Sequence, residues 1–327
     1  MTTPSFKPPI KAKLWARTPP AIFTPIFGSF GLGIAWKRAV DAFGMPLAPS
    51  EVILGAVTLL YLFALLAYLS KILRRPAAIM DDLKVLPGRG GLAAMTLSGM
   101  LLAAALTPMS EALANTVLTI AVVGHGVLLV LVVITLLRAA PEARSVTPIW
   151  HLTFVGFIVS PIAAVPLGWV GFSHLVFWVS LIAAVVIWSI SAIQFSKGDV
   201  PAPLRPLLAI HLAPAAMLGS VAMLLGYTGA GFGLGIASVV YVVMLLARLK
   251  WLLAGGFSPL WGAFTFPLAA FASQIQLLDG AGMGGPFHVI GGIALIAASL
   301  IVPYVLWKVV QMWTKGTLAV KTNASQA

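Results

Sequence analysis

The stretch GFSPLWGAFTFPLAAFAS, residues 257–274, decides the fold class of this chain. It is apolar enough to lie in a lipid bilayer, yet Pro267 falls in its middle and glycine, serine and threonine interrupt it. Proline removes a backbone donor and clashes with the preceding turn, so we expect a helix to kink or break here. Backbone groups freed in lipid are tolerated only where protein or a water-filled cavity satisfies them. The stretch is therefore predicted to be interior and to line a cavity.

Composition indicates a membrane protein. The chain has 327 residues, of which 60% are hydrophobic and 9% charged, and its mean hydropathy is +1.04. A typical soluble domain carries about 25% charged residues, so we predict a polytopic membrane protein. The chain has no cysteine, which excludes disulfides, thiolate metal sites and cysteine nucleophiles. The net charge of +12 comes from basic residues in short loops, a pattern of membrane topology rather than of nucleic-acid binding.

Hydropathy predicts an all-α fold of ten transmembrane helices. The expected spans are 21–37, 51–72, 91–107, 112–138, 149–168, 171–195, 206–226, 229–250, 259–278 and 286–313. Residues 1–20 are predicted to be a basic cytoplasmic N-terminal segment, 21–314 a single ten-helix transmembrane domain, and 315–327 a cytoplasmic C-terminal tail. A cleaved signal peptide is the alternative for the N-terminal segment, but the leading region is long and the first apolar run is rich in glycine and proline.

The distribution of lysine and arginine predicts the orientation. Of the 20 basic residues, all but Lys37 and Arg38 fall on one side of the ten-span topology. Positive loops face the cytoplasm, so both termini are predicted to be cytoplasmic. The loops on the opposite side at 168–171 and 226–229 are very short, which predicts five helical hairpins that close on the outside.

A repeat runs through the hairpins. The odd-numbered spans carry prolines and small residues, whereas the even-numbered spans are mostly aliphatic. Pro161, Pro214 and Pro267 are spaced 53 residues apart. Small and polar residues favour helix interfaces or cavities, so we predict an inner ring of five odd helices that lines a central pore, and an outer ring of five even helices. A compact bundle, in which these residues serve packing alone, is the alternative.

Three motifs resemble a known family. They are WGAFTFPLA (261–269), TPPAIFTPIFGSFGLGIAW (18–36) and RPLLAIHLAPAA (205–216). Together they resemble the tellurite-resistance/dicarboxylate transporter family, which includes bacterial TehA-type proteins, yeast malate and sulfite carriers and plant slow-type anion channels. The resemblance implies ten helices around a pore, a homotrimer, anion passage and a gating phenylalanine in the ninth helix, which falls on Phe266. It also implies a bacterial inner-membrane location.

The chemistry of the spans favours a passive anion pathway. No charged residue lies deep within a predicted span, which argues against a carboxylate-based cation carrier or a conventional proton pump. We expect Phe266 to gate the pore. The predicted pore-lining or kink residues are Pro25, Gly28, Pro161, Pro214, Thr265 and Pro267. The expected partners are small monovalent anions, dicarboxylates, oxyanions and the lipid bilayer, with no nucleic acid.

Two other functions stay open from the sequence. One is a secondary active exporter of tellurite, malate, sulfite or lipophilic cations, with or without proton coupling. The other is a membrane oxidoreductase with haem bound by intramembrane histidines such as His125 and His211. His211, on a predicted inner helix, is also a candidate pH sensor. No P-loop, HExxH or dinucleotide motif is present, so we predict neither an enzyme, nor a cofactor, nor a metal site.

Overall fold

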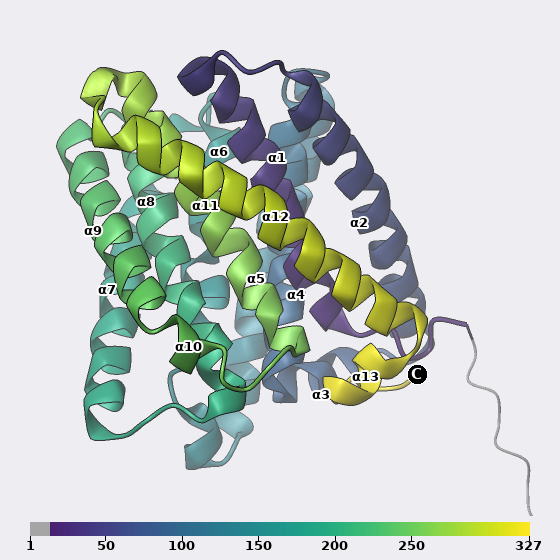
Figure 1. Cartoon of the computed structure of the whole chain (residues 1–327). Coiled ribbons are helices and arrows are strands. Elements are labelled where there is room, and N and C mark those ends of the chain that lie inside the picture. The colour runs from purple at the N-terminus through teal and green to yellow at the C-terminus, as the bar shows by residue number, and fades with distance from the viewer. Residues whose placement is uncertain (1–13) are drawn as a thin grey trace, which may run out of the picture.

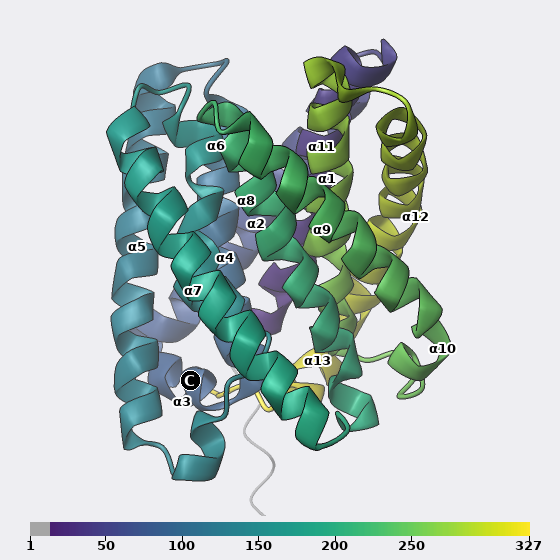
Figure 2. The same cartoon turned by 90° about the vertical axis from the view of Figure 1, so that its left-hand side faces the viewer.

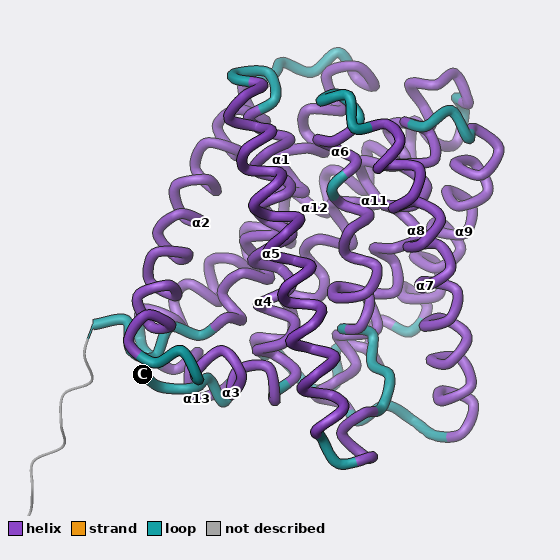
Figure 3. Tube along the Cα trace, turned by 180° about the vertical axis from the view of Figure 1, so that it is seen from behind, coloured by secondary structure: helices purple, strands orange, loops and turns teal. Residues whose placement is uncertain are grey.

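The computed structural model describes residues 14–327, apart from the side chains of residues 142 and 143, and every regular element in this part of the chain is a helix. Figure 3 shows these helices joined by short loops. The predicted basic segment over residues 1–20 lies largely outside the described residues, because only residues 14–20 fall within them.

Five long helices run without interruption and expose much of their surface. Only 17–33% of the most apolar part of each is buried, so their outer faces present leucine, isoleucine and valine. Such surfaces suit lipid rather than water. These peripheral helices are α2 (Ala48–Arg74), α5 (Glu111–Arg138), α7 (Val170–Lys197), α9 (Thr228–Ala247) and α12 (Pro286–Thr314). Figures 1 and 2 show them on the outside of the molecule.

Five interior elements alternate with the peripheral helices along the chain. The apolar part of α4 is 78% buried and that of Ala202–Leu224 is 83% buried. The interior elements are α1 (Phe23–Phe43) after a 3-10 turn Pro20–Ile22; α4 (Leu86–Leu106); the π turn His151–Val155 with the 3-10 turn Gly156–Val159 and α6 (Pro161–Ala164); the 3-10 run Ala202–His211 with α8 (Leu212–Leu224); and the 3-10 turn Pro259–Trp261 with α11 (Gly262–Leu278).

Contacts between the interior elements form a closed series. The helix α1 packs on α4, α4 on the segment 151–164, that segment on α8, α8 on α11, and α11 on α1. Each interior element also contacts the peripheral helix that follows it in sequence. The interior elements therefore surround a common centre, with the peripheral helices outside.

Seven helices in residues 14–327 are long and apolar enough to cross a membrane. They are the five peripheral helices, α4 and Ala202–Leu224. The chain is therefore an all-helical, multi-pass membrane protein. The other three predicted spans correspond to α1, to the broken segment 151–164 and to α11, so the ten-helix arrangement stays a prediction.

Two local expectations need correction. We expected a helix through Pro267 to kink or break, but α11 is not broken there: it is one helix from Gly262 to Leu278, and the 3-10 turn precedes it. The backbone departs from the α-helix at residues 151–159, directly before Pro161 begins α6, and again at Ala202–His211. Proline is well tolerated in a first helical turn, where its missing donor has no intrahelical partner.

The second correction concerns the loop predicted between the second and third spans. It contains the helix α3 (Ala78–Lys84), and α4 begins at Leu86 instead of residue 91. The predicted tail is also partly helical, as α13 (Thr317–Lys321). Figure 1 shows α3 and α13 close together at one end of the molecule, which we call the basic end because most loops with lysine and arginine lie there.

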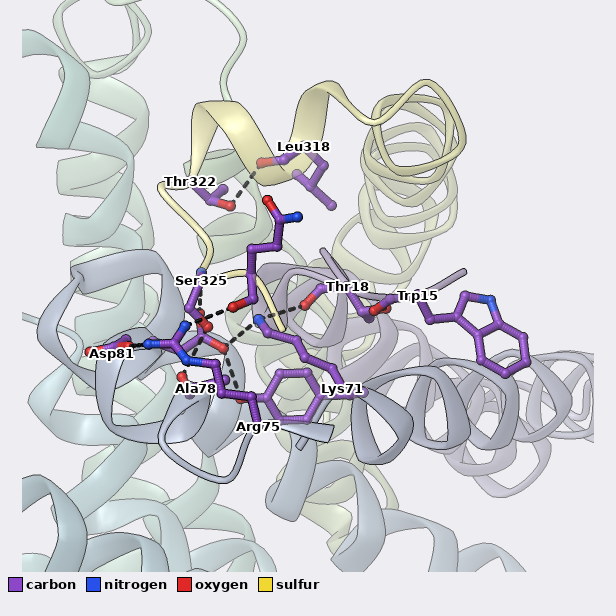
Figure 4. Close-up of polar contacts among 12 residues, drawn as sticks. Trp15, Thr18, Lys71, Arg75, Ala78, Asp81, Leu318, Thr322 and Ser325 are labelled. Carbon is purple, nitrogen blue, oxygen red and sulfur yellow. Dashed lines mark hydrogen bonds and ion pairs between the residues drawn. The ribbon is translucent and has the colours of Figure 1, made fainter. Parts of the chain in front are cut away.

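A buried ion pair joins these pieces at the basic end (Figure 4). Lys71 Nζ lies 2.7 Å from Asp82 Oδ2, and neither side chain is exposed. Tyr68 Oη donates to the same carboxylate oxygen at 2.9 Å, and Lys71 also donates to the Thr18 carbonyl at 3.1 Å. The backbone N–H of Ser325 donates to Asp82 Oδ1 at 2.7 Å. Asp82 therefore ties α2, α3 and the segment after α13 together.

Replacement of Asp82 by alanine should lower the free energy of unfolding by about 3–5 kcal/mol, because Lys71 is left buried without its counter-ion. The melting temperature of the purified protein in detergent measures this loss. The control is Asp81→Ala, which removes partly exposed ion pairs with Arg75 and Lys84 and should cost at most about 1 kcal/mol. Equal melting temperatures for the two variants would contradict the buried pair.

Candidate functional site

A small cavity lies at the centre of the interior elements. Its volume is about 70 Å³, and all five interior elements contribute to its wall. One lining residue from each is Thr24 of α1, Ala94 of α4, Val155 of the π turn, Met217 of α8 and Phe266 of α11. The closed series of helix contacts thus encloses a space, which we call the central cavity.

The wall of the central cavity is almost entirely apolar. Among the described residues that line it, Thr24 and His151 are the ones with polar side chains, and none is charged. The Thr24 hydroxyl already donates to the Ala21 carbonyl at 2.9 Å. An ion inside would meet no fixed opposite charge, so passage would depend on pore size and on the cost of dehydration.

The Phe266 ring occupies a defined place on this wall. It stacks on the Phe27 ring of α1, with the ring centroids 3.6 Å apart and the planes tilted by 19°. It is 6% exposed. A Cβ atom added to Gly31 would lie 3.0 Å from Phe266 Cδ2, so the ring also rests against a position without a side chain. One face of α1 therefore contacts the ring at two positions, Phe27 and Gly31.

The contact between α1 and α11 places Phe266 there. A Cβ atom on Gly28 would collide with Thr265, and one on Gly262 would collide with Thr24. The two helices can approach this closely only because glycine stands at both points. The Thr265 hydroxyl donates to the Gly262 carbonyl at 2.7 Å and lies 3.3 Å from the Thr24 carbonyl of α1. Helix spacing at this point thus fixes the position of the neighbouring phenylalanine.

An apolar cluster lines the cavity toward the basic end. Its buried members are Ile149, Leu207 and Ile210, and Leu86 and Leu260 pack against them. All five residues also line the central cavity. They lie at or near the starts of four interior elements. We call these five side chains the aliphatic collar.

The intramembrane histidines have different environments. His125 is fully buried, with Nδ1 2.7 Å from the Thr96 hydroxyl and Nε2 3.1 Å from the Thr153 carbonyl. Both ring nitrogens of His125 therefore already have hydrogen-bond partners. His151 Nε2 lies 2.9 Å from His211 Nδ1, and these two rings form a buried pair.

A model of the voltage-dependent anion channel family matches residues 17–310. The chain belongs to this family. The match spans all five interior elements and most of the last peripheral helix, and it confirms the family that the three sequence motifs resemble. Members are channels or transporters for anions rather than enzymes. The comparison with curated proteins found no match.

Of the residues predicted from sequence, three line the central cavity: Phe266, Pro214 and Pro267. The other predicted pore or kink residues, Pro25, Gly28, Pro161 and Thr265, are buried and are not among its lining residues. Gly28 and Thr265 instead form the contact between α1 and α11. His211 lines a second cavity, between α7 and α9, rather than the central one.

Sequence reasoning missed three residues that build the site: Phe27, Gly31 and His151. Phe27 and Gly31 are four residues apart, a spacing that puts both on one face of a helix, so a pairing of that face with Phe266 was accessible from the motif at 18–36. His151 lies two residues inside a predicted span. Its sequence neighbourhood carries no signal that it would face His211, because that contact joins residues 60 positions apart.

Replacement of Gly28 by alanine should destabilise the protein by about 1–3 kcal/mol, because the added methyl group cannot fit against Thr265 without displacing α11. Gly55 of α2 is the matched control, since an added Cβ atom there meets nothing within 4 Å. Gly55→Ala should leave stability unchanged or raise it by up to about 1 kcal/mol. Thermal unfolding in detergent compares the two, and equal effects would refute the close contact.

Proposed function

We propose that this chain is a gated anion channel in which the Phe266 ring closes a neutral pore. The observation that supports it most directly is the Phe266 ring stacked on Phe27 at the wall of a cavity enclosed by all five interior elements. Family membership supports anion transport in general. The proposal adds the closing residue and the passive mechanism.

The energetics of the stacked pair suit a gate. An aromatic pair contributes about 0.5–1.5 kcal/mol beyond the burial of its area. Thermal motion supplies such an energy readily, and 1.4 kcal/mol corresponds to a tenfold change in an equilibrium. The Phe266 ring could therefore leave Phe27 without unfolding α11. The contact between Gly28 and Thr265 would keep the helices in place while the ring moves.

A neutral wall favours conduction over tight binding. A fixed positive charge inside the pore would hold an anion and slow its exit. The central cavity offers apolar surface, a threonine hydroxyl and one histidine. We propose that small monovalent anions, dicarboxylates and oxyanions pass, selected by size and by their cost of dehydration.

The membrane arrangement that we propose has ten spans. The three elements that fall short of the criteria for a spanning helix, α1, 151–164 and α11, lie among spanning helices, where protein satisfies irregular backbone. The chain would then form five hairpins in two rings. The excess of lysine and arginine at the basic end supports a cytoplasmic location for that end and for both termini. On the family resemblance we also propose a bacterial inner membrane and a homotrimer.

The alternative is a secondary active exporter of tellurite, malate, sulfite or lipophilic cations. The buried pair of His151 and His211 favours it, because paired imidazoles can carry a proton. Flux measurements in proteoliposomes separate the two functions. A channel gives anion flux that does not depend on a proton gradient, whereas a coupled carrier gives flux that the gradient drives.

Removal of the ring by Phe266→Ala should raise anion current by tenfold or more, because the stack that closes the pore is lost. Phe27→Ala should give a smaller rise, since the ring remains but loses its partner. Planar-bilayer recordings with purified protein and chloride or nitrate on both sides measure the currents.

The matched control is Phe264→Ala. Phe264 lies on the same helix and contacts Trp261, but it is not among the residues that line the central cavity. Its current should stay within about twofold of the wild type, well short of the tenfold change that 1.4 kcal/mol would bring. An unchanged current in Phe266→Ala, or an equal rise in both variants, would show that Phe266 is not the gate.

A further inference from the structure

The segment 147–153 concentrates buried polar atoms that lack partners. Of the nine such side-chain atoms found within residues 14–327, four belong to this segment: Thr147 Oγ1, Trp150 Nε1, His151 Nδ1 and Thr153 Oγ1. Buried polar atoms are nearly always hydrogen-bonded, so a cluster of exceptions points to a missing ligand, ion or water. The segment is also where the chain forms a π turn, His151–Val155, and π turns recur at functional sites.

His151 is the member of this group that reaches the pore. It lines the central cavity and is 3% exposed. Its Nε2 atom is engaged 2.9 Å from His211 Nδ1, which leaves Nδ1 as the free nitrogen of the ring. No other side chain that lines the cavity within the described residues carries a ring nitrogen.

The partner ring of His211 faces a different space. It lines a partly open cavity of about 880 Å³ between α7, α9 and the run Ala202–His211, which we call the lateral cavity. Two histidines therefore connect the central cavity with the lateral one. Arg248 and Asp199 are the charged residues that line the lateral cavity within residues 14–327. Asp199 is paired with Arg205 at 2.9 Å.

The side chains that pack around the His151–His211 pair are aromatic, and their polar atoms donate to backbone carbonyls. Trp188 of α7 donates from Nε1 to the His211 carbonyl at 3.2 Å, and its ring lies 5.7 Å from the His151 ring. Tyr241 of α9 donates its hydroxyl to the Leu208 carbonyl at 2.9 Å. Neither group supplies the missing partner of His151 Nδ1.

The hydrogen bond between the rings allows two neutral arrangements. In the first, His151 Nε2–H donates to His211 Nδ1, and His151 Nδ1 is an acceptor that repels an anion. In the second, His211 Nδ1–H donates to His151 Nε2, and His151 Nδ1–H is a donor that can bind an anion. A proton added to His211 Nε2 from the lateral cavity makes both rings donors and gives the pair one positive charge.

We propose that His151 Nδ1–H coordinates the permeating anion, and that His211 determines from the lateral cavity whether this nitrogen donates. This inference rests on the proposed function. The ligand class is a small monovalent anion, for which one donor is a weak site that still permits exit. Protonation of the pair adds a positive charge beside the pore, so anion affinity in the pore should rise as the pH falls.

Three conservative variants separate the two nitrogens. The amide of asparagine lies near the position of Nδ1 and that of glutamine near the position of Nε2. His151→Gln therefore keeps a group toward His211 but removes the donor to the anion. His151→Asn keeps a polar group in place of Nδ1 and loses the contact with His211. His211→Asn keeps a partner for His151 but cannot be protonated.

The experiment records anion currents in the Phe266→Ala background across chloride concentrations at pH 5 and pH 8. His151→Gln should raise the chloride concentration for half-maximal current by roughly tenfold at pH 5. His151→Asn and His211→Asn should stay within about threefold at pH 8 and lose the pH dependence. A merely structural hydrogen bond would affect stability in all three variants and leave the chloride affinity and pH profile unchanged.

Crystals of the wild-type protein soaked in bromide give an independent readout. Anomalous density within hydrogen-bond distance of His151 Nδ1 is expected, and stronger density at pH 5 than at pH 8. Bromide elsewhere, with water alone at His151, would overturn the proposal even if a variant failed to fold. A Phe266→Ala protein that carries no anion current would instead refute the proposed function, a result distinguishable from loss of the histidine site alone.

Discussion

The close approach of α1 and α11 is the constraint on which the site depends. Glycine at residues 28 and 262 lets the helices touch at Thr265 and Thr24, and any side chain at either glycine would force them apart. Phe266 follows Thr265 directly, so its stacking on Phe27 is a consequence of this spacing. The position of the Phe266 ring therefore depends on both helices and would change if either of them moved.

On the proposed function, the central cavity would be an anion pathway that has no fixed charge on its wall. In a medium of low dielectric constant, a single buried charge interacts strongly with a passing ion and would trap or exclude it. An uncharged apolar wall would avoid both outcomes, but an ion that entered it would lose part of its hydration shell. One histidine with a free nitrogen is the smallest addition that could offset part of the cost of that loss.

Much of the fold was accessible from the sequence, because hydropathy and the alternation of broken and aliphatic segments reflect burial directly. The segments around Pro25, Pro161, Pro214 and Pro267 are interior, whereas α9 is peripheral although it carries four glycines. What failed was local: Pro267 suggested a break, yet the structure places the irregular backbone before it, at Pro259–Trp261. Proline indicates where a donor is missing, but whether the helix ends depends on neighbours distant in sequence.

The site was accessible only in part for the same reason. Phe266 lies in a recognisable motif and could be predicted from the sequence. Phe27 and His151 contribute to the site through contacts with residues far away along the chain, which the sequence does not reveal. Hydropathy also treats charged loops as surface, so it gave no reason to expect that Lys71 and Asp82 would both be buried. Pairing, together with the hydrogen bonds from Tyr68 and Ser325, offsets part of the desolvation cost that keeps an isolated charge out of the interior.

The partners of Asp82 at the basic end become available at different times during synthesis. Asp82 follows Lys71 by eleven residues, so the two can meet soon after the second helix leaves the ribosome. The N–H that satisfies the other carboxylate oxygen comes from Ser325, 243 residues after Asp82. Asp82 Oδ1 can therefore accept this hydrogen bond only after residue 325 has been synthesised. A chain whose synthesis stopped before residue 325 would leave Asp82 Oδ1 without this hydrogen-bond donor.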